Sequence, residues 1–265
     1  MNSTPDLTAP ATTVPARPTS GTLTYAALDL RRQLRDKGGM FFIVALPVFM
    51  YLVFGTGGTE QVGSGNVAMY VTISMAAYAA VTATTSVSGT AAAEQTMGWG
   101  RQLALTPLRP ASFVALKAGV AMTVAAVPVA LIYVVGAVTG AQGDTRDWVL
   151  SAAVVWVGSA MFAAYGLAVC LIFKGPNAVS IASGLVVVMS FLGNVFMPLE
   201  GTMLDIARFS PMYGYTMLAR YPQTEGWLLD GSHDPLWLLI TSVVLWTLAF
   251  GSVAAWGMRR SKERA

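Results

Sequence analysis

The sequence predicts an all-α membrane protein in which six helices cross the bilayer. Of the 265 residues, 55% are hydrophobic and only 11% are charged, whereas soluble domains carry about 25% charged residues. The hydrophobic residues gather in six long uncharged stretches, and most basic residues flank those stretches. A chain of this size has a large surface to cover, so we expect lipid to replace water over much of it.

Both ends of the chain lie outside the predicted membrane domain, which covers residues 23–258. Residues 1–22 are rich in Thr, Pro and Ala and show no apolar period, which is typical of a disordered tail. They lack the apolar centre of a signal peptide, so we expect the first apolar stretch to be retained. Residues 259–265 form a short basic tail, which we place in the cytoplasm.

An amphipathic helix is predicted just before the first span. Apolar residues recur there at helical spacing while the arginines fall on other faces. The apolar positions are Leu23, Ala27, Leu30 and Leu34, and the arginines are Arg31, Arg32 and Arg35. This pattern indicates a helix that lies along the membrane surface with its arginines toward lipid phosphates. The alternative is a solvated helix in a soluble neck.

The six predicted spans differ in length and polarity. They cover residues 39–55, 66–93, 118–139, 148–173, 178–197 and 236–258. The first is short for a bilayer, which needs about 20 residues, and it contains Pro47. The third contains Pro128, and residues 174–177 form the predicted tight turn between the fourth and fifth spans. We find no internal repeat and no second domain.

The second span carries many hydroxyl side chains, and these have two interpretations. They line a polar pathway for a cargo, or they form a helix–helix interface in which small residues allow close packing. Under the first interpretation, the candidate pathway residues from the second and fifth spans are Thr82, Thr85, Ser86, Phe191 and Asn194.

The distribution of basic residues predicts the orientation. With the N-terminus in the cytoplasm, 13 of the 16 basic residues fall in cytoplasmic segments, as the positive-inside rule requires. The outer segments keep only Arg146, Arg208 and Arg220. Six spans return the C-terminus to the same side. A miscounted span would mix the two sets, so the clean partition favours six.

The long outer segment, residues 198–235, is expected to contain two short apolar helices that meet at Pro211, because proline interrupts a continuing helix. We expect these helices to dip back into the outer leaflet or to cap the bundle. Asp205 and Arg208 are three residues apart and are expected to pair on one helical face. Tyr213 belongs to the same candidate segment.

Several chemistries are missing from the sequence. There is no phosphate-binding Gly-x-x-x-x-Gly-Lys-Ser/Thr loop, no Gly-x-Ser-x-Gly elbow and no cluster of His, Cys, Asp and Glu with metal-ligand spacing. His233, the one histidine, leaves a membrane enzyme as an alternative. The spans lack acids and bases at their centres, which argues that any energy source lies on another chain.

The cytoplasmic loop between the second and third spans is unusually apolar for a connector. The residues expected to act in it are Glu94, Trp99, Arg101, Leu103, Thr106, Pro107 and Arg109. Its apolar side chains are suited to filling a groove on a partner, with the arginines setting the orientation. The alternative is a helix that rests on the lipid surface.

An acidic residue at the end of the second span is followed by a glycine, then Arg101-Gln102-Leu103, then Thr106-Pro107-Leu108. This order, with Lys117 opening the third span, resembles the permeases of type-2 ATP-binding-cassette exporters, and most of all actinobacterial drug or antibiotic efflux permeases. In that family the pattern forms a cytoplasmic coupling helix. Gln95 stands where the family often has arginine. The resemblance covers about residues 25–258 and includes the surface helix, the six spans and the outer segment.

The resemblance implies a permease subunit in the plasma (inner) membrane that exports an amphipathic or apolar cargo such as a drug, an antibiotic or a lipid-like molecule. It implies a separate nucleotide-binding ATPase subunit that holds ATP and Mg²⁺, and a second permease subunit, identical or different. No cofactor is expected on this chain, and no nucleic acid. The alternatives are a polysaccharide or glycolipid exporter permease and a non-transporting membrane anchor or immunity protein.

Overall fold

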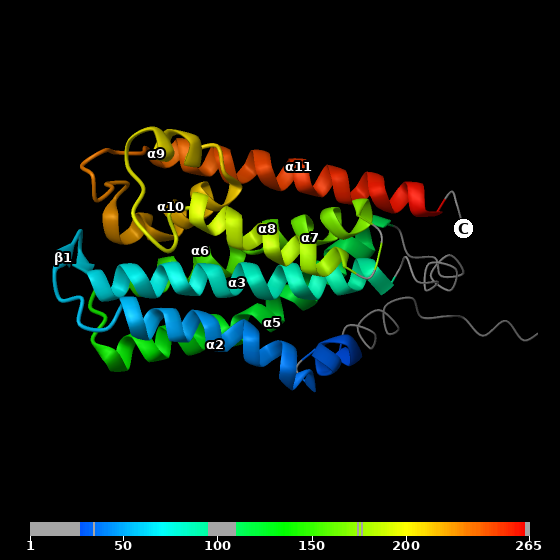
Figure 1. Cartoon of the computed structure of the whole chain (residues 1–265), viewed down its shortest axis with the longest axis horizontal. Helices are drawn as coiled ribbons and strands as arrows, with labels where there is room; N and C mark the ends of the chain where they lie inside the picture. Colours follow the sequence, from blue (N-terminus) through cyan, green and yellow to red (C-terminus); the bar gives the residue numbers. More distant parts are fainter. Residues whose placement is uncertain (1–26, 34, 95–109, 174, 176, 263–265) are drawn as a thin grey trace, which may run out of the picture.

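Long helices run side by side along the length of the molecule (Figure 1). The computed structural model describes residues 27–33, 35–94, 110–173, 175 and 177–262. The bounds of its elements are α2 Lys37–Phe54, β1 Gln61–Val62, β2 Gly65–Asn66, α3 Val67–Glu94, α5 Pro110–Thr139, α6 Thr145–Gly158, α7 Ala160–Ile172, α8 Ala178–Leu192, α9 Gly201–Ala207, α10 Pro211–Thr224 and α11 Leu236–Lys262. The predicted all-α class is therefore confirmed, and its one departure in the described chain is the antiparallel β1–β2 hairpin.

The two ends of the bundle differ, and we name them by what they carry. The hairpin end contains β1–β2, α9 and the start of α11, and the tail end contains the end of α11 and the start of α2 (Figure 1). Within the described ranges, four helical segments are long and apolar enough to cross a membrane: Val67–Ala92, Ala115–Thr139, Thr145–Ile172 and Leu236–Arg260.

Two further segments correspond to the first and fifth predicted spans. Helix Ala27–Gln33 and helix Gly38–Phe54 are bent by 68° relative to each other and pass the span test together, which raises the number of candidate spans to five. The predicted helix along the membrane surface stays a prediction. Helix α8 has 15 residues, or about 22 Å, shorter than the hydrocarbon core of a bilayer. Six spans therefore remain a prediction.

Several element boundaries differ from the predicted spans, and the following differences are the largest or fall within a span. Helix α5 begins at Pro110, before the predicted start at 118. The fourth span consists of α6 and α7, which meet at Ser159 within the continuous candidate span Thr145–Ile172. Beside this point, a Cβ added at Gly158 would lie 2.7 Å from the Tyr215 ring. Helix α8 ends at Leu192 rather than 197, because Gly193 follows and Asn194 adopts a left-handed φ of 57°. The helices continue through both Pro47 and Pro128.

Helix α3 forms the centre of the bundle, and α11 forms its edge. In the apolar window of α3, 83% of the residues are buried, against 11% in α11. Helix α3 contacts α2, α5, α6, α7, α8 and α10. Large apolar side chains such as Trp237, Leu245 and Leu248 remain exposed on α11, as expected of a helix that faces lipid or another membrane chain.

Helix α10 is short but almost completely buried. It packs against α3, α6, α8 and α11 at the hairpin end, inside the bundle rather than on its surface (Figure 1). The predicted break at Pro211 is confirmed, because Pro211 is the first residue of α10 and Ser210 caps it. The prediction that α10 is apolar is wrong, because its buried face includes Arg220 and Gln223. Arg220, counted above among the outer basic residues, is an interior side chain.

Candidate functional site

At the tail end, α3 ends at Glu94 and α5 begins at Pro110. The other expected coupling residues, Trp99, Arg101, Leu103, Thr106, Pro107 and Arg109, lie outside the described residues. What the structure describes is how the two flanking helices are anchored. Helix α3 is held by its central position, and the first turns of α5 are held by a buried ion pair.

The ion pair joins Lys117 on α5 to Asp29 on the first helix. The Lys117 Nζ lies 2.6 Å from Asp29 Oδ2, and the two side chains are only 2% and 7% exposed. A small apolar cluster surrounds this end, in which Leu30 and Met40 pack against residues of α3, α5 and α7. The first helix, α2 and the start of α5 are thus connected directly after the predicted coupling loop. Lys117 was expected to open the third span and Asp29 falls within the predicted amphipathic helix, but no sequence pattern indicated that they pair.

The hydroxyls of α3 are bonded mostly to their own helix. Thr72, Ser74, Thr82, Thr84 and Ser88 each donate to the carbonyl four residues earlier. Such bonds leave the outer surface of the helix free for close packing.

Among the candidate pathway residues of α3, Thr85 is fully buried and its hydroxyl lies 3.5 Å from the Phe162 carbonyl of α7. Gly166 of α7 packs there so closely that an added Cβ would lie 2.5 Å from Ser88 Oγ. Thr82 and Ser86 are half-buried. The interface interpretation therefore fits Thr85, whereas a pathway through Thr82 or Ser86 stays a prediction.

The two candidates near the end of α8 face different surroundings. The Phe191 ring is 51% exposed and packs against Phe196, with the ring centroids 4.9 Å apart. Asn194 is buried, and its side-chain oxygen accepts a hydrogen bond from the Leu199 backbone N–H. Its amide nitrogen lies 4.0 Å from Met217 Sδ of α10. Asn194 thus holds the turn that leads to α9.

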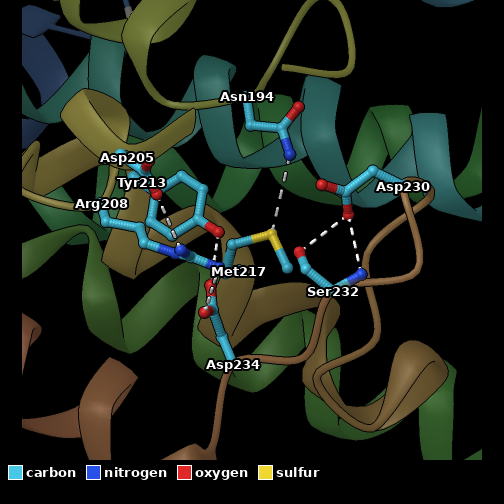
Figure 2. A network of polar contacts seen from close by, with 8 residues as sticks. All are labelled: Asn194, Asp205, Arg208, Tyr213, Met217, Asp230, Ser232 and Asp234. Carbon is cyan, nitrogen blue, oxygen red and sulfur yellow. Dashed lines mark hydrogen bonds and ion pairs between the residues drawn. The ribbon is translucent and has the colours of Figure 1, made fainter. Parts of the chain in front are cut away.

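The segment between α8 and α11, which was predicted to lie outside, contains a charged network that includes three of the predicted residues (Figure 2). Arg208 Nη1 lies 3.1 Å from Asp205 Oδ1, so the expected pair is present. Arg208 Nη2 lies 3.0 Å from Oδ1 of the buried Asp234, and the Tyr213 hydroxyl donates to the other oxygen of Asp234. The pKa of Tyr213 is raised, mainly by burial and to a smaller extent by the hydrogen bond to Asp234. Tyr213 therefore stays protonated, and the network joins α9, α10 and the start of α11.

A second network closes the hairpin end, and sequence analysis did not find it. The Gln223 amide of α10 donates to the carbonyls of Val62 and Asn66 at 3.0 and 3.1 Å. Ser64 donates to the buried carboxylate of Asp147 at 2.7 Å. These bonds connect the hairpin, α10 and the start of α6 across large sequence separations, which no local pattern predicts.

The geometry offers little for enzyme chemistry. His233 packs against Trp227, with the ring centroids 4.9 Å apart and the ring planes tilted by 59°, and one ring nitrogen lies 3.2 Å from the Glu225 carbonyl oxygen. Among the described residues, no three of His, Cys, Asp and Glu are grouped to hold a metal ion. Cys170 is a buried free thiol. The networks around Asp234 and Gln223 instead connect helices.

Comparison with known proteins gives a family for this arrangement. No curated protein sequence matches the chain. The sequence model of the ABC-2 type transporter family matches residues 22–223, a range that begins before the helix Ala27–Gln33 and ends inside α10. Because the match covers most of a helical chain with several candidate spans, this protein belongs to the ABC-2 type transporter family, as a membrane permease subunit.

Proposed function

We propose that this permease is an exporter subunit, driven by a separate nucleotide-binding ATPase that holds ATP and Mg²⁺. The cargo is amphipathic or apolar, and two permease subunits, identical or different, pair around its route. The tail end faces the cytoplasm of the cell whose plasma membrane holds the protein, and the ATPase docks on the loop between Glu94 and Pro110. The chain itself binds no nucleotide and catalyses no reaction.

The buried pair Lys117–Asp29 is the observation that best supports this function. It lies two turns into α5, directly after the docking loop, and it connects α5 to the first helix. Met40 of α2 packs in the apolar cluster at the same end. A displacement of the loop therefore acts on α5, the first helix and α2 together. Such rigid transmission is what a motor on another chain needs in order to bias a bundle between two arrangements.

The distribution of charge supports the orientation. In the described chain, the tail end carries Arg31, Arg32, Arg35, Lys117, Arg259 and Arg260, whereas the hairpin end carries Arg146, Arg208 and Arg220. Positive residues favour the cytoplasmic side of a span. Single-cysteine labelling tests this, because the native Cys170 is buried. A membrane-impermeant maleimide should label Thr59→Cys at the hairpin end in intact cells, and Arg31→Cys only after permeabilisation. The opposite result would reverse the orientation.

The docking loop is tested by co-purification of the permease with the ATPase chain. Glu94→Ala combined with Arg101→Ala should weaken the recovery of the ATPase while the permease still elutes as a folded species. A matched control, Glu200→Ala with Arg146→Ala, removes one acid and one arginine at the hairpin end and should leave recovery unchanged. Equal recovery from both double variants would exclude docking through this loop.

Transport itself is measured in vesicles that contain the permease–ATPase complex. ATP-dependent movement of an amphipathic dye supports an exporter. ATP consumption without movement of any cargo favours the anchor or immunity protein, and movement of a lipid-linked sugar alone favours the glycolipid exporter. Activity that depends on His233 and not on the ATPase would favour the membrane enzyme.

A further inference from the structure

Arg220 is a fully buried cation near the centre of the hairpin half of the bundle. Its side chain belongs to α10 and is only 1% exposed. Nε and Nη2 donate to Ser74 Oγ of α3 at 3.0 and 2.5 Å. The guanidinium carbon lies 3.8 Å from the centroid of the Tyr70 ring. The remaining contact is weak, because Nη1 lies 3.9 Å from Met217 Sδ.

None of these partners carries a negative charge. The other cations buried or half-buried in described ion pairs meet carboxylates: Lys117 meets Asp29, and Arg208 meets Asp205 and Asp234. Arg220 meets a hydroxyl, a ring and a thioether, and no ion pair involving it occurs among the described residues. An arginine side chain stays protonated in proteins, and burying an unpaired ion costs several kcal/mol. Such a charge in a membrane bundle indicates a functional site.

A second polar group on the same helix is unused. Thr216 Oγ1 is buried and has no hydrogen-bond partner in the structure. Thr216 lies four residues before Arg220, so both side chains are on the same face of α10. Buried hydroxyls in proteins are normally hydrogen-bonded. The face therefore presents a positive charge and an unused donor together.

The depth of this face suits the headgroup of an amphipathic molecule. Ser74 lies seven residues into α3 from the hairpin end, or about 10 Å. This is within the outer half of the membrane in the proposed orientation. A headgroup at that depth keeps its acyl chain among the apolar residues of the bundle or in lipid.

We propose, on the basis of the proposed function, that Arg220 receives the carboxylate or phosphate headgroup of an amphipathic molecule when α10 moves relative to α3. The planar guanidinium suits these groups because it donates two parallel hydrogen bonds to them. The Tyr70 ring covers one face of the guanidinium. At the Nη1 edge, the weak contact with Met217 Sδ is the one that a ligand oxygen most easily replaces. The Thr216 hydroxyl supplies a further donor.

The experiment uses the complete permease–ATPase complex in phosphatidylcholine nanodiscs without ATP. The probes are dodecanoate, dodecanol and dodecyltrimethylammonium, which share a chain and differ in charge. We expect dodecanoate to bind about tenfold or more tightly than the cation, the effect of one charge-assisted contact. Nanodiscs that also contain phosphatidylglycerol show whether the natural ligand is a membrane lipid or a transported cargo. Competition by that lipid assigns the site to a membrane headgroup, whereas ATP-driven export of dodecanoate without competition assigns it to a cargo.

The variants separate the site from a structural role. Arg220→Met should lose the preference for dodecanoate, Arg220→Lys should keep most of it, and the exposed control Arg146→Gln should not change it. Equal binding of dodecanoate and the cation to the unmodified complex would overturn the proposal, even if Arg220→Met failed to fold. An unchanged preference in Arg220→Met would also overturn it. Because binding is measured without ATP, loss of vesicle transport would refute the exporter and leave this result intact.

Discussion

Removing one partner of the Lys117–Asp29 pair should destabilise the bundle far more than removing both. At the observed 2.6 Å, Coulomb's law with an effective dielectric constant of about 20 gives an attraction of about 6 kcal/mol. Desolvation of the two ions costs several kcal/mol each, so the intact pair is close to neutral in net stability. Lys117→Met leaves the buried Asp29 carboxylate without this partner. We expect it to lower the free energy of unfolding by about 3–5 kcal/mol.

The assay is unfolding of the purified permease by sodium dodecyl sulfate in mixed micelles, arranged as a double-mutant cycle with Asp29→Asn. The combined variant should be more stable than Lys117→Met alone, because the stranded charge is gone. Arg146→Met is the matched control, since it breaks a pair with Glu225 that is 62% and 70% exposed, and it should change stability by less than about 0.5 kcal/mol. A Lys117→Met protein as stable as this control would refute the reasoning.

Two further predictions concern close backbone approaches. Gly63 has a φ of +60°, and a Cβ there would lie 1.9 Å from the Gln223 carbonyl oxygen. Gly63→Ala should therefore lower the free energy of unfolding by more than about 2 kcal/mol. The control Gly57→Ala has a φ of +86° but open space around the added methyl group, and it should cost about 1–2 kcal/mol. Equal losses of stability in thermal unfolding would contradict the clash between Gly63 and Gln223. Gly166→Ala, where α7 meets α3 without room for a methyl group, should cost about 1–3 kcal/mol. The control Gly184→Ala on α8, where an added Cβ has nothing within 4 Å, should be neutral or stabilising. If the Gly166→Ala and Gly184→Ala proteins had the same melting temperature, close packing of α7 on α3 would be refuted.

The sequence predicted best what depends on local chemistry. Pro211 lacks an N–H and fixes its own φ, which suits the first position of a helix, and α10 begins there. The apolar stretches predicted where helices lie, because a membrane span must satisfy its own backbone. The close approach of the Tyr215 ring to Gly158 was not predicted, since Tyr215 lies on a helix far along the chain.

The candidate site was predicted less completely, because its contacts are distant in sequence. Lys117 and Asp29 are 88 residues apart, and Ser74 and Arg220 are 146 apart. Charge counting assigned Arg220 to an outer loop, where arginines are normally exposed. One signal was present in the sequence. Tyr213, Thr216, Arg220 and Gln223 recur at spacings of three and four, which places polar groups on one face of a helix.

Helix α3 meets α7 and α10 through different kinds of contact, and this difference bears on how the bundle moves. Toward the tail end, Gly166 of α7 packs directly on Ser88, and separating such surfaces loses many van der Waals contacts. Toward the hairpin end, α10 meets α3 through the hydrogen bonds of Arg220 to Ser74. An incoming anion can replace those bonds, so opening there costs less. We therefore expect a motion begun at the tail end to open the bundle between α10 and α3, while α3 and α7 move as one unit.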